Sequence, residues 1–372
     1  MLFNRGILIS MLILSLLFLF SCSRKDSNIT YKIELKNNVK NVYNYKPLYS
    51  EKEYITLEKI YSIELLSDKY EISGATDMVV DNENNLYVLS VFEGTVTVFD
   101  ENGKYIRTMG QHGEGPQDLN RPIRFSLYEN KLHIIEGYNS RIKIWDTKGE
   151  YVKKIFITPS NYYLIKTIKN GYLVLSFMIT GDNRKIRNWS FSKTSINFKD
   201  KNVLFKYEQN IDTESKFSPE SLLAINKNNQ FYFPEKSDIY SIIKYDISGK
   251  PLLSFGRKYK RIPFSKEARM YKQKRFGEND LPKYPPVIRI VFIDSKENVW
   301  VVSGEISRDV EEKLIEVEVD IFNKDGIWLY SFKTNNIVNQ SFIKNDRLYT
   351  VTKISPITGQ QYINVYKIHY NY

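Results

Sequence analysis

Hydrophobic and polar residues alternate in short runs along most of the chain, a pattern that predicts strands rather than helices. A middle strand, usually following an Asn-rich turn, recurs six times at intervals of about 40 to 70 residues. The six runs are Leu86 to Val88, Leu132 to Ile134, Tyr172 to Val174, Phe231 to Phe233, Val299 to Val301 and Leu348 to Thr350. Helical periodicity of any length is missing from the sequence, so we expect an all-β chain built from repeats.

A second repeated feature marks the end of a later strand in each unit. It consists of an aromatic residue, Asp or Asn, two further residues and Gly, as in Phe99 to Gly103 and Trp145 to Gly149. Asp or Asn and Gly supply the positive φ angles that a tight hairpin turn requires. Four strands in each of six units predict a six-bladed β-propeller, in which the strand region Tyr54 to Leu66 closes the last blade, begun by residues 339–372.

The best preserved unit is Arg107 to Gly149. It resembles the NHL repeat in its glycines and prolines, Gly110, Gly113, Gly115, Pro116 and Pro122, and in its corner Asn139-Ser140-Arg141. The whole chain resembles the NHL-like six-bladed propeller lipoproteins common in Bacteroidetes. That resemblance implies the fold far more than it implies an activity.

The N-terminal segment has the form of an export signal. Arg5 precedes an apolar run from Ile7 to Phe20, which is too short to cross a bilayer as a helix. The sequence Leu19-Phe20-Ser21-Cys22 resembles the lipobox of bacterial lipoproteins, so we expect Cys22 to carry lipid. We therefore predict a signal peptide over residues 1–21, a tether over 22–53 and the propeller over 54–372.

Cys22 also bears on compartment and chemistry. It is the only cysteine in the chain, which excludes disulfides within one chain and thiolate metal clusters. Its lipid would anchor the protein to a membrane of the bacterial cell envelope. Ser23-Arg24-Lys25 lacks the acidic run associated with surface export in such lipoproteins, so we expect the protein to face the periplasm.

Positive charge is concentrated in one segment. The chain has a formal net charge of +11, and residues 257–285 hold ten Lys or Arg against three acidic residues. This segment is either a solvated loop or a patch for an anionic membrane, an acidic glycan or a protein. Export argues against nucleic acid. The candidate patch residues are Arg257, Lys258, Lys260, Arg261, Lys272, Lys274 and Arg275.

Candidate ligand residues come from two places. Counting back from the middle strands puts Asp77, Arg124 and Gln340 at comparable starts of inner strands, with Arg289 displaced by one residue. These four would border the central channel, as ligand contacts or as ordinary solvated polar groups.

The glycine-rich turn from Gly110 to Pro116 is the second place. It lacks the Lys-Ser/Thr ending and the following helix of a phosphate-binding loop, so we interpret it as a turn between blades. His112 and Glu114 on this turn are left as candidate ligand contacts.

Catalytic residues, metal ligands and cofactors are not predicted. The three histidines, His112, His133 and His369, fall in unlike positions and do not converge. The first hypothesis is therefore a non-catalytic, membrane-anchored, monomeric propeller that binds a protein, peptide or glycan. The alternative is a periplasmic metal-dependent propeller lyase or hydrolase, which requires three or more His, Asp or Glu side chains to converge in the channel.

Overall fold

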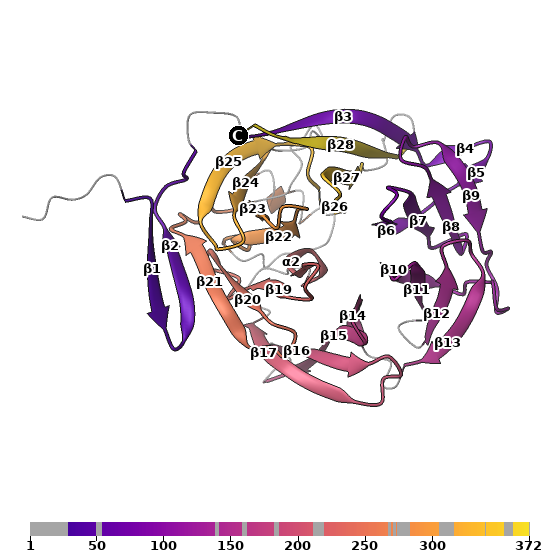
Figure 1. Cartoon of the computed structure of the whole chain (residues 1–372), viewed down its shortest axis with the longest axis horizontal. Coiled ribbons are helices and arrows are strands. Elements are labelled where there is room, and N and C mark those ends of the chain that lie inside the picture. Colours follow the sequence, from indigo (N-terminus) through magenta and orange to yellow (C-terminus); the bar gives the residue numbers. More distant parts are fainter. Residues whose placement is uncertain are drawn as a thin grey trace, which may run out of the picture.

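Six sheets, each containing four antiparallel strands, surround a common axis in a computed structural model of the chain (Figure 1). This arrangement is a six-bladed β-propeller, so the fold predicted from the sequence is confirmed. The structure describes residues 29–49, 54–137, 141–157, 162–181, 186–210, 219–266, 269–270, 273, 283–304, 316–338, 340–352 and 360–371.

The first three blades follow one another in the sequence. Blade 1 contains β6 (Ala75–Val80), β7 (Leu86–Ser90), β8 (Thr95–Phe99) and β9 (Tyr105–Met109). Blade 2 contains β10 (Pro122–Tyr128), β11 (Lys131–Glu136), β12 (Arg141–Asp146) and β13 (Tyr151–Phe156). Blade 3 contains β14 (Tyr162–Ile168), β15 (Gly171–Thr180), β16 (Ile186–Ser195) and β17 (Lys201–Asn210).

The remaining blades complete the ring. Blade 4 contains β18 (Ala224–Ile225), β19 (Phe231–Pro234), β20 (Ser241–Tyr245) and β21 (Pro251–Arg257), preceded by the one-turn helix α2 (Pro219–Leu222). Blade 5 contains β22 (Ile288–Ile293), β23 (Val299–Ser303), β24 (Val317–Phe322) and β25 (Trp328–Thr334). Blade 6 contains β26 (Ser341–Lys344), β27 (Arg347–Val351), β28 (Tyr362–Tyr370) and β3 (Ile55–Glu64).

The antiparallel order gives the ring two different faces. The first strand of each blade is nearest the axis and the fourth lies at the perimeter (Figure 1). Connections from first to second and from third to fourth strand therefore lie on one face, which we call the turn face. Connections from second to third strand, and from one blade to the next, lie on the opposite face, which we call the loop face.

The Asp/Asn-x-x-Gly motif forms the turns between third and fourth strands. The Oδ1 atom of Asp100 accepts hydrogen bonds from the backbone N–H groups of Asn102 (2.9 Å) and Lys104 (2.8 Å). Asp146, Asp246 and Asn323 each accept the same pair of bonds two and four residues on. Gly103 has a φ of +79°, and an added Cβ atom would lie 2.6 Å from the Tyr61 ring. The motif thus combines a side-chain-capped turn with close packing against the preceding blade.

Ring closure joins the two ends of the propeller. Strand β3 pairs antiparallel with β28 along its length, from Tyr362 opposite Glu64 to Tyr370 opposite Ile55. The prediction that an early strand completes the last blade is therefore confirmed. A two-stranded hairpin of β4 (Leu66–Ser67) and β5 (Tyr70–Glu71) then leads into blade 1.

A second hairpin lies within the segment expected to be a tether. Strands β1 (Tyr31–Lys36) and β2 (Val39–Asn44) form it, and β2 pairs in parallel with β21 at the edge of blade 4 (Figure 1). Val42 is 2% exposed and packs into the core of that blade. Part of the predicted tether is thus paired structure, because β2 adds to the open edge of blade 4 and buries Val42 there.

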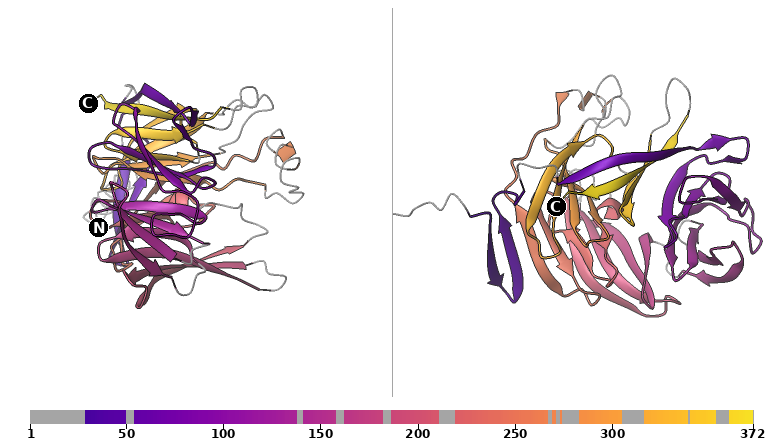
Figure 2. Two further views of the ribbon diagram at one scale, coloured as in Figure 1. Left: turned by 90° about the vertical axis from the view of Figure 1, so that its right-hand side faces the viewer. Right: turned by 45° about the horizontal axis from the view of Figure 1, so that its top comes forward.

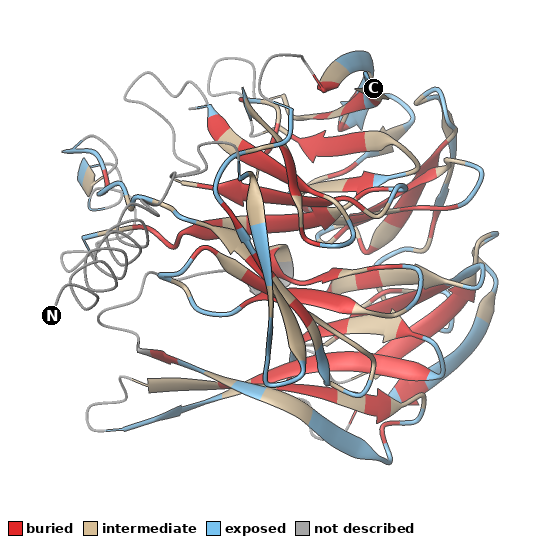
Figure 3. Ribbon diagram, turned by 60° about the vertical axis from the view of Figure 1, so that its left-hand side comes forward, coloured by how far each residue is buried: buried red, intermediate tan, exposed pale blue. Residues whose placement is uncertain are grey.

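The core consists of apolar side chains packed between neighbouring blades. Trp145, Trp189 and Trp300 are at most 1% exposed, and buried residues run through the middle of the sheets (Figure 3). All six predicted middle strands are found here, as the second strands β7, β11, β15, β19, β23 and β27. They are buried because each is covered on both faces by adjacent blades.

Substitution of Ile63 tests the contribution of ring closure. Ile63 in β3 is 2% exposed, so Ile63→Ala should lower the free energy of unfolding by about 2–4 kcal/mol through lost burial and cavity formation. Ile60 in the same strand is 37% exposed, and Ile60→Ala serves as the matched control with an expected loss under about 1 kcal/mol. Urea unfolding measures both free energies. Equal losses would contradict the expectation that the buried side chains of the closing strand stabilise the fold.

His133 makes stability depend on pH. It is 4% exposed, its Nδ1 atom lies 2.9 Å from the Tyr172 hydroxyl, and burial, with smaller effects of Lys131 and Lys153, lowers its pKa to about 4. Between about pH 6.5 and pH 4 the unfolded chain binds a proton that the folded chain does not, so acidification destabilises the fold.

We therefore expect the free energy of unfolding to fall by about 2–3 kcal/mol between pH 7 and about pH 4.5 in the parent chain, through this residue. His133→Gln should remove that part of the fall, whereas His369→Gln, at a site 36% exposed in its side chain, should leave it in place. Urea unfolding at the two pH values measures it. An unchanged pH dependence in His133→Gln would contradict the assignment.

Candidate functional site

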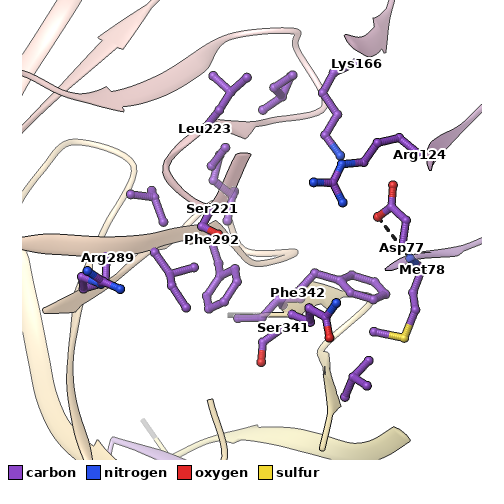
Figure 4. A pocket seen from close by; sticks show the side chains of 18 of the residues that line it. Asp77, Met78, Arg124, Lys166, Ser221, Leu223, Arg289, Phe292, Ser341 and Phe342 are labelled. Atoms are coloured by element: carbon purple, nitrogen blue, oxygen red, sulfur yellow. Dashed lines mark hydrogen bonds between the residues drawn. The ribbon is translucent and has the colours of Figure 1, made fainter. Parts of the chain in front are cut away.

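A cavity of about 600 Å³ lies on the axis of the ring, between the first strands of the blades (Figure 4). Its wall comes from the first strands of all six blades, β6, β10, β14, β18, β22 and β26, and from β27, α2 and Leu223 between α2 and β18. Its volume is in the range of ligand-binding cavities in proteins. The polar residues in its lining are Asp77, Arg124, Tyr163, Lys166, Ser221, Arg289, Gln340 and Ser341.

The four inner-strand candidates all line this cavity. Asp77, Arg124, Arg289 and Gln340 come from four different blades and meet there, as the count from the middle strands predicts. A register shift occurs at the start of the inner strand in blades 1, 2, 3 and 5. Such a bulge re-aims the side chains beside it. Arg289 is itself the extra residue of its bulge, whereas Asp77 and Arg124 directly follow the extra residue of theirs, which accounts for its displacement by one position.

Sequence reasoning missed Lys166, Tyr163 and Ser221. The count places Leu164 at the equivalent position of blade 3, and Leu164 is buried beside the two cavity residues of that strand. Lys166 lies two positions after Leu164, so the alternation of side chains along a strand could have indicated that it faces the same way. Ser221 lies on α2, a single turn that interrupts the strand pattern and so has no periodic signature.

Charge is distributed unevenly around the cavity. Arg124 and Lys166 lie together near Asp77 on one wall, and Arg289 lies across from them (Figure 4). The carboxylate of Asp77 accepts hydrogen bonds from the backbone N–H groups of Met78 (3.1 Å) and Phe125 (3.1 Å), which ties β6 to β10. Three cations against one carboxylate leave the lining with a net charge of +2. A site of this kind favours an anion.

Apolar groups complete the wall. The rings of Phe292 and Phe342 lie in the lining, with Leu223 above them (Figure 4). Tyr163 adds a ring that is 39% exposed. The cavity therefore offers both cationic groups and aromatic surface, the combination that orients a small ligand with a charged group and a less polar body.

Glu114 and His112 lie away from this cavity, on the loop face between blades 1 and 2. The Glu114 carboxylate accepts from Arg141 Nη2 (2.8 Å) and from the Asn120 side chain. Arg141 also donates to the buried Glu136 (2.9 Å). His112 forms an isolated bridge with Leu119 across the same turn. Glu114 is thus part of an ion-pair network that holds the glycine-rich turn, in agreement with its interpretation as a turn between blades.

Arg257 is buried, unlike the exposed basic patch to which the sequence assigns it. Its side chain is 10% exposed, and its guanidinium is 2.7 Å from Asp320 and 3.2 Å from Glu318. It also lies over the rings of Tyr240 (4.7 Å) and Trp328 (4.9 Å). Burial by itself would lower the pKa of Arg257, but the combined effect of Asp320, Tyr240 and Glu318 outweighs burial and raises it. The prediction that Arg257 belongs to an exposed basic surface is therefore wrong, because its charge is used inside blades 4 and 5.

The other patch candidates divide into two groups. Lys258 and Lys260 are exposed, and Arg261 lies over the ring of Tyr284 at 4.5 Å. Lys272, Lys274 and Arg275, and the proposed lipidation site Cys22, lie outside the described residues. Figure 2 shows the described part of this insertion, in orange, standing off from the loop side of the ring.

The enzyme alternative requires three or more metal-ligating side chains to converge in the channel. Among the described residues no group of three or more His, Cys, Asp or Glu side chains is placed to hold a metal ion. In the same part of the chain no helix is long and apolar enough to span a membrane.

Known proteins share this ring of six blades. Residues 23–309 match DUF5128, described as a 6-bladed beta-propeller, and the chain belongs to that family. The expected family of six-bladed propellers is thereby confirmed, whereas the NHL character of the unit 107–149 stays a prediction. None of the curated proteins matches the chain.

Solved structures agree on the fold at low identity. A Bacteroides fragilis protein described as exported has a TM-score of 0.53 at 12% identity, covering 89% of this chain and 99% of its own. A DUF4221 member from Bacteroides vulgatus has a TM-score of 0.54 at 12% identity, covering 86% and 100%. Virginiamycin B lyase from Staphylococcus aureus has a TM-score of 0.40 at 10% identity, covering 84% and 99%, which carries no argument about activity.

The buried position of Arg257 leads to a stability prediction. Arg257→Gln leaves the 0% exposed Asp320 without its cation and should lower the free energy of unfolding by about 3 kcal/mol or more. Lys258→Gln, next along the chain and exposed, should change it by less than about 0.5 kcal/mol. Chemical denaturation compares the two. Similar small effects would mean that the Arg257 pair contributes nothing to the fold.

Proposed function

We propose that this chain is an exported, lipid-anchored propeller that binds an anionic glycan in its central cavity without catalysing a reaction. The observation that carries the proposal is the convergence of Arg124, Lys166 and Arg289, from three blades, on one cavity with a single carboxylate, Asp77. The signal peptide predicted over residues 1–21, followed by the lipid expected on Cys22, would supply the anchor, and the Bacteroides fragilis protein described as exported supports an address outside the cytoplasm.

The cavity supports a glycan for a physical reason. A sugar acid presents a carboxylate that charged donors bind strongly, and a ring whose C–H face can pack on aromatic side chains. Arg124 and Lys166 on one wall, with Phe342 and Tyr163 in the lining, provide both kinds of contact. Rings of the propeller type place such residues at the axis because each blade delivers its first strand there.

Binding of oligogalacturonate, a carboxylated glycan, tests the proposal. The parent chain should bind it in calorimetry, and affinity should fall as salt rises because charge attraction is screened. Arg124→Gln, Lys166→Gln and Arg289→Gln should each weaken binding about tenfold, the usual effect of one charge-assisted hydrogen bond. Lys206→Gln, at an exposed lysine on the perimeter strand β17, is the matched control and should bind like the parent.

A neutral galactan oligomer of the same length should bind far more weakly than the acid. Equal affinity for the two oligomers, or equal affinity of the cavity variants and Lys206→Gln, would overturn the proposal. Thermal unfolding of each variant establishes that the fold is intact before affinities are compared.

A further inference from the structure

The chain enters the ring beside the point where the basic insertion leaves it. Tyr31 in β1 pairs with Asn44 in β2, and Asn44 pairs with Arg257 at the end of β21. Neighbouring strands are about 4.8 Å apart, so Tyr31 and Arg257 are separated by about 10 Å. The insertion begins with the next residue, Lys258.

The length of the free tether is set by this hairpin. Eight residues, 23–30, separate Cys22 from Tyr31, and an extended chain covers about 3.3–3.6 Å per residue, so the hairpin can lie at most about 30 Å from the anchor. A tether running without structure to Ile55 at the start of β3 would reach about 110 Å. If lipid on Cys22 is inserted in a membrane, the β1–β2 hairpin therefore keeps this side of the ring close to that membrane.

The insertion exposes a mixed basic and apolar surface. Ile262 is 66% exposed and Met270 is 59% exposed, the two largest apolar exposures among the described residues between 257 and 287. Exposed lysines flank them, and residues 258–285 hold nine Lys or Arg against the three acidic residues Glu267, Glu278 and Asp280. We call the following six side chains the insertion surface: Lys258, Lys260, Ile262, Lys266, Met270 and Lys283.

We propose that the insertion surface docks on the anionic lipid membrane in which Cys22 is anchored. The inference rests on the lipid anchor of the proposed function and is independent of what the cavity binds. Lysines at an anionic lipid surface gain charge attraction within about one Debye length, roughly 8–10 Å, and exposed Ile and Met side chains can enter the interface. The short tether supplies the proximity that such weak contacts need.

Membrane docking accounts for the mixture of lysines and exposed apolar residues on the insertion surface better than a solvated loop or a glycan site does. A solvated loop needs lysines but gains nothing from exposing Ile262 and Met270 beside them. An acidic glycan would meet lysines here without a cavity to enclose it, since the described cavity is on the ring axis. The insertion stands off from the ring in Figure 2, which leaves it free to reach a surface.

Site-directed fluorescence on the lipidated full chain tests this inference. Cys22 is the only cysteine, so once it is acylated an introduced cysteine is the single free thiol for a fluorophore. Ile262→Cys reports the insertion surface, and Val203→Cys, 52% exposed on β17, is the matched control. The probe is a vesicle of phosphatidylethanolamine and phosphatidylglycerol that contains a lipid with a quencher on its headgroup.

The label at position 262 should be quenched about threefold or more above the label at 203 in the anionic vesicles, and the excess should shrink in phosphatidylcholine vesicles and at high salt. Lys258→Glu with Lys260→Glu should abolish the excess. Lys104→Glu with Lys148→Glu, an equal change of charge at exposed lysines of the turn face, should preserve it.

Equal quenching at the two positions, or quenching that ignores lipid charge, would overturn the inference. Two results would show that the lipid anchor is missing. One is reaction of the fluorophore with Cys22 of the parent chain, and the other is release of the parent chain from membranes to the same extent as Cys22→Ala. Either result would overturn both the anchor and this docking. Glycan binding by the cavity is measured separately, so its failure is distinguishable from either result.

Discussion

Closure of the ring by β3 and β28 is the constraint on which the other features depend. The two strands are about 300 residues apart in the sequence and pair from Ile55 opposite Tyr370 to Glu64 opposite Tyr362. Closing so long a loop costs chain entropy, which the pairing and the burial of Ile63 and its neighbours must offset. The axial cavity exists only in the closed ring, because its residues come from different blades. Fold stability and site geometry therefore rest on the same contact.

The positive charge of the chain serves three separate purposes. Arg257 and Arg141 are ion-paired within the fold, where they join blades and hold the turn between them. Arg124, Lys166 and Arg289 line the cavity and make it attractive to anions. The exposed lysines of the insertion surface form the third group. A net charge of +11 does not distinguish these uses, since each depends on what surrounds the cation.

Anchor, insertion and cavity fit one arrangement of the molecule. The tether enters at blade 4, beside the insertion, while the starts of the inner strands, including Asp77 and Gln340, are near the loop face. An insertion that stands off from the ring would separate the cavity from the lipid surface rather than press it against the bilayer (Figure 2). In this arrangement the proposed membrane contact and the proposed glycan site can operate together.

The sequence by itself determined the six repeats, the ring and the closing strand. It could do so because alternation, Asp/Asn-Gly turns and middle strands such as Leu132 to Ile134 are local patterns, each visible within a single repeat of the sequence. Asp77, Arg124 and Gln340 were also accessible by counting, because repeats place equivalent residues at equivalent positions. Lys166 and Ser221 were not, since the count reaches the buried Leu164 in blade 3, two positions before Lys166, and Ser221 lies on the single turn α2 outside the strand pattern.

Only the tertiary structure decided the roles of individual charges and of the N-terminal segment. Arg257 and Lys258 are adjacent basic residues that the sequence cannot tell apart. The first is buried against Asp320, 63 residues away, and the second faces solvent. The same holds for residues 31–44, whose polar composition indicates a tether but whose β2 strand pairs with the open edge of β21, more than 200 residues later. In both cases the deciding partner is distant in sequence, and a local pattern contains no record of it.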